Sequence, residues 1–310
     1  MPRKRYSPEP SALVKFGTHS GGATMINEDI ITTTRKGLPR VDMPEQKPRL
    51  KIYGERNTGT TFLRELMKRN FAVSMLSGTP WAREGHDARD KVADEFQHHP
   101  SWTKKLVRDR FSDLINRKHM NDTLGWKHMY PPISILKNAP ELTRNTIFMV
   151  TAKHPVFWAL SFHRHPYHHY FKTDNMTFAD FIRHPFIPMI SDNVDVPYYK
   201  SIIELYGAKV DGYRELASLD LTMELVRYEN LVANVMGFLD EMTAKYGLAR
   251  RSKEPAILGR STKGDARTLA DFQTAYKVEN AMKAVSEEDY RFIISVFGRR
   301  RLAWLGYAEE

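Results

Sequence analysis

Apolar residues along the chain follow strand-like and helix-like spacings from about residue 49 onward. Short apolar runs bounded by turn residues predict three strands, at residues 50–53, 145–152 and 221–228. Apolar side chains at helical spacing predict four helices, at residues 61–70, 154–170, 230–246 and 286–297. Because the strands alternate with helices, the pattern predicts an α/β fold of three layers, with a central, mostly parallel sheet flanked by helices.

The first residues of the chain differ from the rest in pattern. Residues 1–48 carry Pro, Gly, Ser and Thr clusters and no sustained period, which predicts a poorly ordered segment before an α/β domain at residues 49–310. The start, MPRKR, is not followed by an apolar run, so we expect no signal peptide. No apolar stretch approaches the ~18 residues of a membrane span, so none is predicted.

Composition narrows the partners and the chemistry. The 310 residues include no cysteine, which excludes disulfides, thiolate metal sites and a cysteine nucleophile and is compatible with a cytoplasmic location. The formal net charge of +10 favours an anionic partner. Because no nucleic-acid-binding signature appears, we expect a small anionic ligand and no nucleic acid; peripheral membrane contact stays open.

A glycine-containing loop joins the first predicted strand to its helix. It reads GERNTGTT at residues 54–61. Backbone N–H groups and the dipole at the start of such a helix form an anion site, to which threonine hydroxyls add donors. Gly54 and Gly59 have the spacing of a Walker A loop, but Thr60 and Thr61 follow where Lys and Ser/Thr are required. The missing lysine counts against ATP or GTP hydrolysis.

A second candidate anion site follows the second predicted strand. Lys153 lies at the carboxyl end of that strand, where α/β sheets bind ligands. Ser161 lies about two helical turns further on, where its hydroxyl can face the same anion.

The loop sequence RNTGTT at residues 56–61 resembles the 5′-phosphosulfate loop of sulfotransferases that use 3′-phosphoadenosine 5′-phosphosulfate (PAPS). In that family the basic residue usually stands two places before the glycine, where this chain has Asn57, with Arg56 one place earlier. The resemblance implies that the phosphosulfate is held by Arg56, Asn57, Thr58, Gly59, Thr60 and Thr61.

Four later segments resemble the family in the same order. KHPVFWALS at residues 153–161 resembles its 3′-phosphate segment, which implies that Lys153 and Ser161 bind that phosphate, with Lys153 in place of the usual arginine. RYENL at 227–231 resembles a segment whose tyrosine, here Tyr228, lies near adenine. GRSTKGD at 259–265 resembles a late loop that closes over the 3′-phosphate, here through Arg260, Lys263 and Gly264. LAWLGY at 302–307 resembles a common C-terminal ending.

The candidate base lies in GWKHMYP at residues 125–131, which we predict to end a short strand. The resemblance implies a lysine and a histidine base at this place, and the chain has them adjacent, as Lys127 and His128. Histidine titrates near neutral pH and can accept the proton of an acceptor hydroxyl. Since neighbours on a strand point to opposite faces, only one of the two should face the donor. Glu55 is the alternative base.

The resemblance therefore implies a P-loop-type sulfotransferase that moves a sulfuryl group from PAPS to a hydroxyl or amine of an unidentified acceptor, such as a carbohydrate, glycolipid or small alcohol. His128, Lys127 and Arg56 are its candidate catalytic residues. No metal is expected, because His165 and His169 have helical spacing but no HExxH pattern. The alternatives are a P-loop small-molecule kinase and a non-catalytic nucleotide- or anion-binding protein of the same fold.

Overall fold

Four parallel strands form the sheet in the part of the chain that the structure describes, which is residues 47–79, 91, 94–167, 175–260 and 266–307. In this computed structural model the strand order is β2-β1-β3-β4. The strands are β1 (Arg49–Tyr53), β2 (Ser74–Met75), β3 (Thr146–Ala152) and β4 (Met223–Arg227). Three of them were predicted from the sequence, and β2 is a short addition at the edge. The expected α/β class with a parallel sheet is confirmed.

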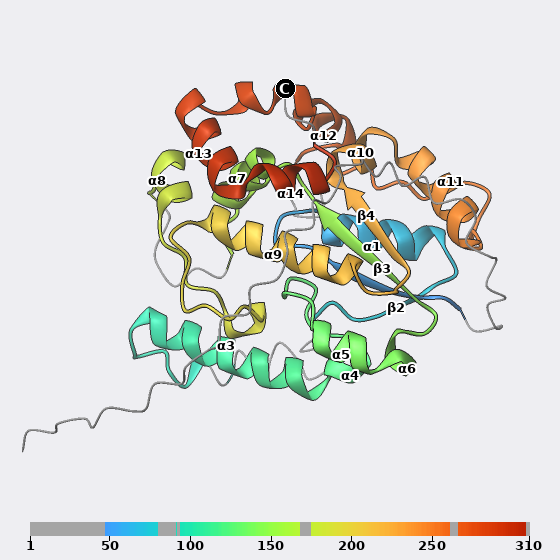
Figure 1. Ribbon diagram of the computed structural model, residues 1–310, viewed down its shortest axis with the longest axis horizontal. Helices are drawn as coiled ribbons and strands as arrows, with labels where there is room; N and C mark the ends of the chain where they lie inside the picture. The colour runs from blue at the N-terminus through green and yellow to red at the C-terminus, as the bar shows by residue number, and fades with distance from the viewer. Residues whose placement is uncertain (1–46, 80–90, 92–93, 168–174, 261–265, 308–310) are drawn as a thin grey trace, which may run out of the picture. The chain divides into compact units, whose positions relative to one another are not determined.

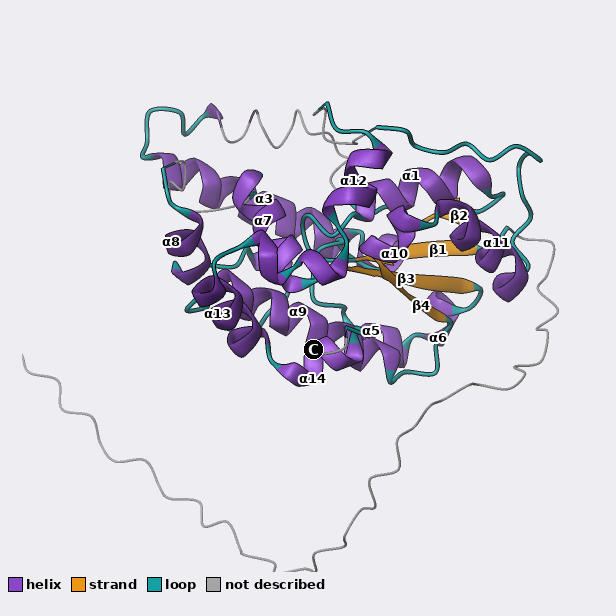
Figure 2. Ribbon diagram, turned by 90° about the horizontal axis from the view of Figure 1, so that it is seen from above, coloured by secondary structure: helices purple, strands orange, loops and turns teal. Residues whose placement is uncertain are grey.

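Helices cover the sheet on both faces. Figures 1 and 2 show α9 (Ile202–Ala217) on one side of the strands, and α1 (Thr60–Asn70) with α11 (Val235–Tyr246) on the other. All seven residues of β3 are buried, as expected for a strand covered on both faces. The remaining helices are α3 (Ser101–Lys118), α4 (Met120–Thr123), α5 (Ile133–Asn138), α6 (Pro140–Thr143), α7 (Pro155–Arg164), α8 (Phe178–Arg183), α10 (Tyr228–Ala233), α12 (Leu269–Ala275), α13 (Glu287–Phe297) and α14 (Arg299–Trp304), with short 3-10 turns η2 (Ile190–Asp192), η3 (Val278–Asn280) and η4 (Met282–Ala284).

The order of the strands reverses between β1 and β3, whose carboxyl ends lie at the same edge of the sheet. The chain passes from β1 through α1 to β2 on one side of β1, and it later returns as β3 on the other side. In such sheets, ligands bind at the carboxyl ends of the strands where the order reverses. The loops that follow β1 and β3 contain both predicted anion sites, so the topology brings these sites to one edge of the sheet.

Three local predictions were wrong. The helix after β3 was expected to reach residue 170, but it ends at Arg164, because His165 leaves the helical conformation with φ −137° and ψ 74°. The helix expected at residues 230–246 is split into α10 and α11. Asn234, and not Asn230, caps α11, and its side chain accepts a hydrogen bond from the Gly237 N–H at 2.9 Å. The third correction concerns residues 125–131, which form a turn and not the end of a strand.

The described residues belong to one compact unit, Met43–Glu310. The segment at residues 1–48, predicted to be poorly ordered, lies outside the described residues except for its last two positions. None of the described helices is long and apolar enough to cross a membrane.

Candidate functional site

The loop from Gly54 to Gly59 makes a tight passage from β1 into α1, and its shape depends on two glycines. A Cβ atom added at Gly54 would lie 2.0 Å from Oγ1 of Thr151, so this position has room only for glycine. Gly59 has φ +98°, a left-handed conformation that other residues adopt at a cost. Glycine is therefore required at position 54 by the close approach of Thr151, and it is favoured at position 59 by the left-handed backbone.

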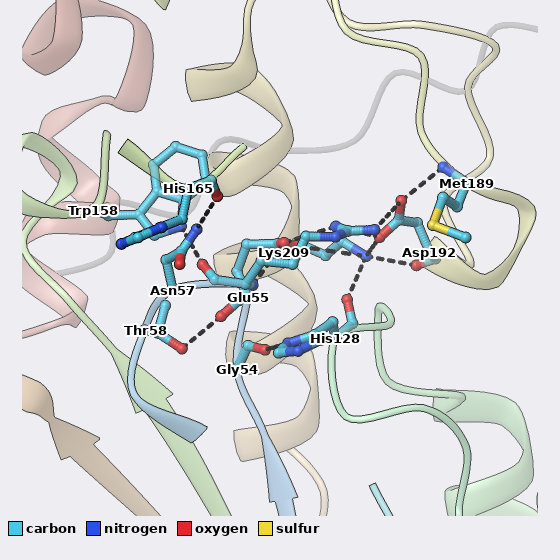
Figure 3. A network of polar contacts seen from close by, with 11 residues as sticks. Gly54, Glu55, Asn57, Thr58, His128, Trp158, His165, Met189, Asp192 and Lys209 are labelled. Atoms are coloured by element: carbon cyan, nitrogen blue, oxygen red, sulfur yellow. Dashed lines mark hydrogen bonds and ion pairs between the residues drawn. The ribbon is translucent and has the colours of Figure 1, made fainter. Parts of the chain in front are cut away.

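Polar groups of the loop brace it internally. The Thr58 hydroxyl donates to the Glu55 carbonyl at 2.7 Å and lies 2.8 Å from the Thr151 hydroxyl on β3. The Asn57 side chain donates to the His165 carbonyl at 3.2 Å, and Trp158 Nε1 donates to the Arg56 carbonyl at 2.8 Å (Figure 3). Thr58 and Asn57, expected to bind the phosphosulfate, thus hold the loop against β3 and α7.

The N-terminus of α1 is open to an anion. Its cap residue, Gly59, has no side chain that could cap it, and its first turn contains no acidic residue. The N–H groups at the start of a helix have no intrahelical acceptor, and the helix dipole makes this end positive. Thr60 is buried, whereas Thr61 is exposed and its hydroxyl lies 3.3 Å from Nζ of Lys127.

Lys127 therefore adds a positive charge at the start of α1. Its side chain passes over Gly78, where an added Cβ would lie 2.9 Å from the lysine Cδ. Burial, followed by repulsion from Arg64, lowers the pKa of Lys127 to about 8. The ammonium keeps most of its charge at neutral pH, and an anion at the start of α1 would lie within its reach.

His128 points to the other end of the same loop. Its Nδ1 lies 2.6 Å from the Gly54 carbonyl oxygen (Figure 3). A carbonyl oxygen only accepts, so Nδ1 carries the proton and Nε2 has the lone pair of the neutral ring. Lys127 and His128 thus contact the loop at its two ends, Thr61 and Gly54, although they are adjacent in sequence.

Buried side chains of β1 fix the turn that carries Lys127 and His128. Nζ of Lys51 donates to the Thr123 carbonyl at 2.5 Å and also to the Gly125 carbonyl. The Tyr53 hydroxyl donates to the Leu124 carbonyl. The Gly54 N–H donates to the carbonyl of Lys127 at 2.9 Å. Burial lowers the pKa of Lys51 well below its usual value, because its charged form is costly to bury, and its Nζ donates to three backbone carbonyls.

Arg56 is part of a buried ion network and not of an open anion site. Its guanidinium contacts both carboxylate oxygens of Asp192 on η2, at 2.9 and 3.0 Å, and Glu55 at 2.7 Å. Nζ of Lys209 on α9 donates to Asp192 Oδ1 at 2.8 Å and to the His128 carbonyl at 2.8 Å (Figure 3). Burial alone would raise the pKa of Asp192, but Arg56 and Lys209 outweigh it and hold the pKa well below its usual range.

This network bears on two predictions. The role of Arg56 at a sulfate stays a prediction, and in this structure the side chain is only 2% exposed and bound to two carboxylates. Glu55, the alternative base, is fully buried and has Oε1 bound to Arg56, while its Oε2 lies 3.9 Å from Nζ of Lys209. Both residues are therefore placed to fix the loop.

Lys153 occupies an aromatic box at the end of β3. Its Nζ lies 4.4 Å from the ring centroids of both Tyr228 and Tyr276. Its hydrogen bond goes to the Ser161 hydroxyl at 3.3 Å, so the two residues predicted to share a phosphate are in contact. Burial lowers the pKa of Lys153, opposed by Tyr276 and Glu229. An ammonium has three donors, so besides its contacts with Ser161 and Tyr276 Lys153 can donate to an anion.

Tyr228 connects the two predicted anion sites. A Cβ added at Gly59 would lie 2.2 Å from Cδ2 of the Tyr228 ring, so the ring lies directly against the start of α1. The same ring faces Nζ of Lys153. The start of α1 and the Lys153 ammonium are therefore separated by one aromatic side chain.

The C-terminal segment 302–307 closes this end of the sheet. The Tyr307 hydroxyl donates to Oε2 of Glu229 at 2.7 Å, and Oε1 of Glu229 accepts from the His154 N–H at 2.9 Å. Arg227 donates to the Gly306 carbonyl. The residue after Lys153 is thus tied to α10 and to the C-terminal segment, so residues 227–231 and 302–307 meet at this end of the sheet.

The late loop is described only in part. Arg260 is exposed and forms an isolated antiparallel bridge with Thr268, the residue that caps α12. Lys263 and Gly264 lie outside the described residues. Their closing role over a phosphate stays a prediction.

Sequence reasoning missed Tyr276, Arg164 and Arg267. The charges of Arg164 and Arg267 act on Tyr276, together with that of Lys153. Arg164 is the last residue of α7, and Arg267 precedes α12. No motif marks these positions, and only the fold shows that α7 and the end of α12 meet at Lys153.

No family model and no curated protein matches this sequence. Within the described ranges, no group of three or more His, Asp or Glu side chains is arranged to hold a metal ion. His169, which the sequence pairs with His165 at helical spacing, lies outside those ranges.

Proposed function

We propose that the protein is a P-loop-type sulfotransferase that moves a sulfuryl group from PAPS to a hydroxyl or amine of its acceptor. One observation supports this most: two cationic positions, Lys127 at the start of α1 and Lys153 beside Ser161, lie at the same edge of the sheet with Tyr228 between them. A donor with anionic groups at its 5′ and 3′ positions needs two such positions.

The donor is oriented by both sites. The N–H groups at the start of α1, with Thr60, Thr61 and Lys127, hold the 5′-phosphosulfate. Lys153 and Ser161 hold the 3′-phosphate, and Tyr228 lies along the nucleotide between them. The resemblance also assigns contacts with the 3′-phosphate to Arg260, Lys263 and Gly264.

The reaction is an in-line displacement at sulfur. The acceptor oxygen forms a bond to sulfur as the bond between sulfur and the bridging oxygen breaks, and that oxygen leaves on the nucleotide with its negative charge. The ammonium of Lys127 stabilises this charge, and Nε2 of His128 accepts the proton of the acceptor hydroxyl. The acceptor is a carbohydrate, a glycolipid or a small alcohol.

Arg56 enters this proposal in a changed role. To contact a sulfate, its guanidinium would have to leave Asp192, and a buried carboxylate that loses its partner costs several kcal/mol. We therefore assign Arg56 to the support of the loop, and the sulfate contact that the motif implied passes to Lys127.

Calorimetry tests the donor assignment. The protein should bind adenosine 3′,5′-bisphosphate much more tightly than AMP, and Lys153→Ala should reduce the preference, because a charged hydrogen bond contributes ~1.5–3 kcal/mol. Equal affinity for the two nucleotides would contradict the roles of Lys153 and Ser161. As a control, Lys245→Ala removes a surface lysine paired with Glu224 and should leave the preference unchanged.

A second assay separates sulfuryl transfer from the alternatives. Labelled PAPS with a panel of acceptors should yield labelled product. The buried state of Arg56 favours one alternative, a protein that binds the nucleotide without turnover, and tight bisphosphate binding with no labelled product would support it. Magnesium-dependent ATP turnover would instead indicate a kinase, against which the absence of the Walker lysine at Thr60 counts.

A further inference from the structure

The Lys153 box contains a tyrosine that no motif predicts. Tyr276 follows α12, and its ring lies 4.4 Å from Nζ of Lys153. Its hydroxyl lies 3.2 Å from Oγ of Ser161, the atom that Lys153 also contacts. Lys153, Ser161 and Tyr276 are all buried. The phenol is thus directly beside the two groups assigned to the 3′-phosphate.

The hydrogen-bond direction follows from the neighbours of Ser161. The Ser161 hydroxyl donates its only proton to the Phe157 carbonyl at 2.7 Å. Its oxygen can then only accept, so Lys153 and the neutral Tyr276 phenol both donate to it. In this arrangement Tyr276 presents a hydroxyl donor at the site, and an anionic oxygen that replaced Ser161 as its acceptor would be bound by the same group. Ser161 itself can bind such an oxygen, or the Tyr276 phenolate, only when its proton turns from the Phe157 carbonyl toward the negative charge.

Within the described residues, the charges that act on Tyr276 or on its neighbour Lys153 come from several elements. Lys153 follows β3, Arg164 ends α7, and Arg267 precedes α12, whereas Glu229 on α10 faces Lys153. Burial would raise the pKa of Tyr276, but Lys153, a hydrogen bond that Ser161 donates to the phenolate, and the two arginines lower it to about 7. The cations around Tyr276 therefore favour ionisation of its phenol near neutral pH.

We propose that Tyr276 is a further residue of the donor site, whose neutral phenol donates a hydrogen bond to the donor's 3′-phosphate and whose phenolate takes the place of that phosphate beside Lys153 and Ser161. This inference rests on the proposed function. Phenolate and phosphate both seek the same cation, and side by side they repel each other. The donor consequently binds the protonated form, and binding above neutral pH is accompanied by uptake of one proton.

The first test is calorimetry with adenosine 3′,5′-bisphosphate at pH 6 and pH 8. If only the protonated form binds, the apparent Kd of the unmodified protein rises about tenfold at pH 8, since that is the fraction of phenol lost when the pKa is about 7. Tyr276→Phe keeps the ring over Lys153 and removes the phenol, so its Kd should rise only about twofold, the part that comes from Lys127 with its pKa of about 8. Tyr246→Phe, which removes a tyrosine hydroxyl bound to Glu224, should behave as the unmodified protein.

The result that overturns the inference is an equal rise of Kd in Tyr276→Phe. The rise would then belong to loss of charge on Lys153 itself. Titration in buffers of different ionisation enthalpy adds a second readout at pH 8, where the unmodified protein should take up about one proton more than Tyr276→Phe on binding.

An arm without nucleotide separates this inference from the proposed function. The ultraviolet absorbance of phenolate should show one tyrosine ionising near pH 7 in the unmodified protein and in Tyr246→Phe, and none there in Tyr276→Phe. Lys153→Met should move the step to higher pH, which also serves if Tyr276→Phe does not fold. Absence of the step contradicts the inference at its root. A step without any bisphosphate binding shows that the Lys153–Tyr276 pair is real and the donor assignment is wrong.

Discussion

At the residue scale, the proposed chemistry depends on which nitrogen of His128 holds the proton. The contact of Nδ1 with the Gly54 carbonyl leaves Nε2 as the basic atom. It also fixes the orientation of the ring beside the loop at residues 54–61. A general base has to be oriented as well as basic, and a backbone carbonyl of the loop itself provides the orientation.

Replacement of His128 tests this role. His128→Ala should lower turnover of labelled PAPS by about 10²–10⁴-fold, the usual contribution of a positioned base, and leave the affinity for adenosine 3′,5′-bisphosphate nearly unchanged. Lys127→Ala should lower turnover and also weaken donor binding, because its ammonium lies at the start of α1. A folded His128→Ala protein with normal turnover would refute the assignment, and Glu55 would be tested next.

Gly59 offers a second test at this scale. Gly59→Ala places a methyl group in the Tyr228 ring and forces a left-handed conformation on alanine, so it should reduce both stability and donor affinity. Gly247→Ala is the matched control: Gly247 also has positive φ, at +62°, but nothing lies within 4 Å of the added methyl group. It should cost only about 1–2 kcal/mol of unfolding free energy, the conformational part, with no change in donor affinity.

At the element scale, the buried ion network around Arg56 joins three segments that are distant in sequence: the loop at residues 54–61, η2 and α9. Arg56, Asp192 and Lys209 are each less than 3% exposed and carry complementary charges. Removal of one member of a buried network leaves the others as unpaired charges, which is more costly than the loss of a surface ion pair. The network therefore holds the loop at residues 54–61 against η2 and α9.

Asp192→Asn should lower the unfolding free energy by about 3–5 kcal/mol near neutral pH, measured by urea denaturation. The pKa of Asp192 is lowered in the folded protein, so its stabilisation is complete above the ordinary aspartate pKa and is lost as pH falls toward the lowered value. The difference between the two proteins should therefore shrink below about pH 4. Glu287→Ala breaks an exposed pair with Arg291 and should change stability by less than about 1 kcal/mol.

The same scale shows what the sequence could and could not predict. Residues 50–53 and 145–152 were recognisable as strands because their apolar runs are bounded by turn residues, and the structure confirms both within one residue. β2 has only two residues, too few to form a pattern. The break between α10 and α11 escaped notice because Asn234, with φ −141°, lies within a helix-like apolar spacing.

The site was predictable where it is local in sequence. The loop at residues 54–61 and the Lys153–Ser161 pair follow strands directly, so their place at the sheet edge follows from the element order. The partners of Arg56 and Lys153 could not be predicted in this way. Asp192 lies 136 residues from Arg56, and Tyr276 lies well over a hundred residues from Lys153, both in segments without any motif. Such pairings are fixed by tertiary packing, which no local pattern records.

At the scale of the whole molecule, the last residues of the described chain hold the proposed site together. Tyr307 and Glu229 connect the C-terminal segment to the residue after Lys153. Burial raises the pKa of Glu229, while the hydrogen bonds from Tyr307 and His154 lower it. The carboxylate thus relies on both partners to remain in a buried position.

Tyr307→Phe should lower the unfolding free energy by about 1–3 kcal/mol, since it leaves one oxygen of a buried carboxylate without its partner. Because Glu229 also holds the backbone at His154, bisphosphate affinity should fall together with stability. Tyr246→Phe removes a comparable hydroxyl contact, to Glu224, which keeps its ion pair with Lys245, and should cost less than Tyr307→Phe. Equal losses in thermal denaturation would contradict the importance of the C-terminal contact.

The hydrogen bond between Thr58 and Thr151 has a consequence for folding kinetics. It joins residues 93 apart in sequence, and both proposed anion sites meet only where β1 and β3 pair. Closing so long a loop is entropically unfavourable, and such distant pairings form slowly. If the proposed donor site is correct, the nucleotide binds only after this late step, and any partial opening that separates the two strands releases it. Bound nucleotide should accordingly slow unfolding and leave the early phases of refolding unchanged.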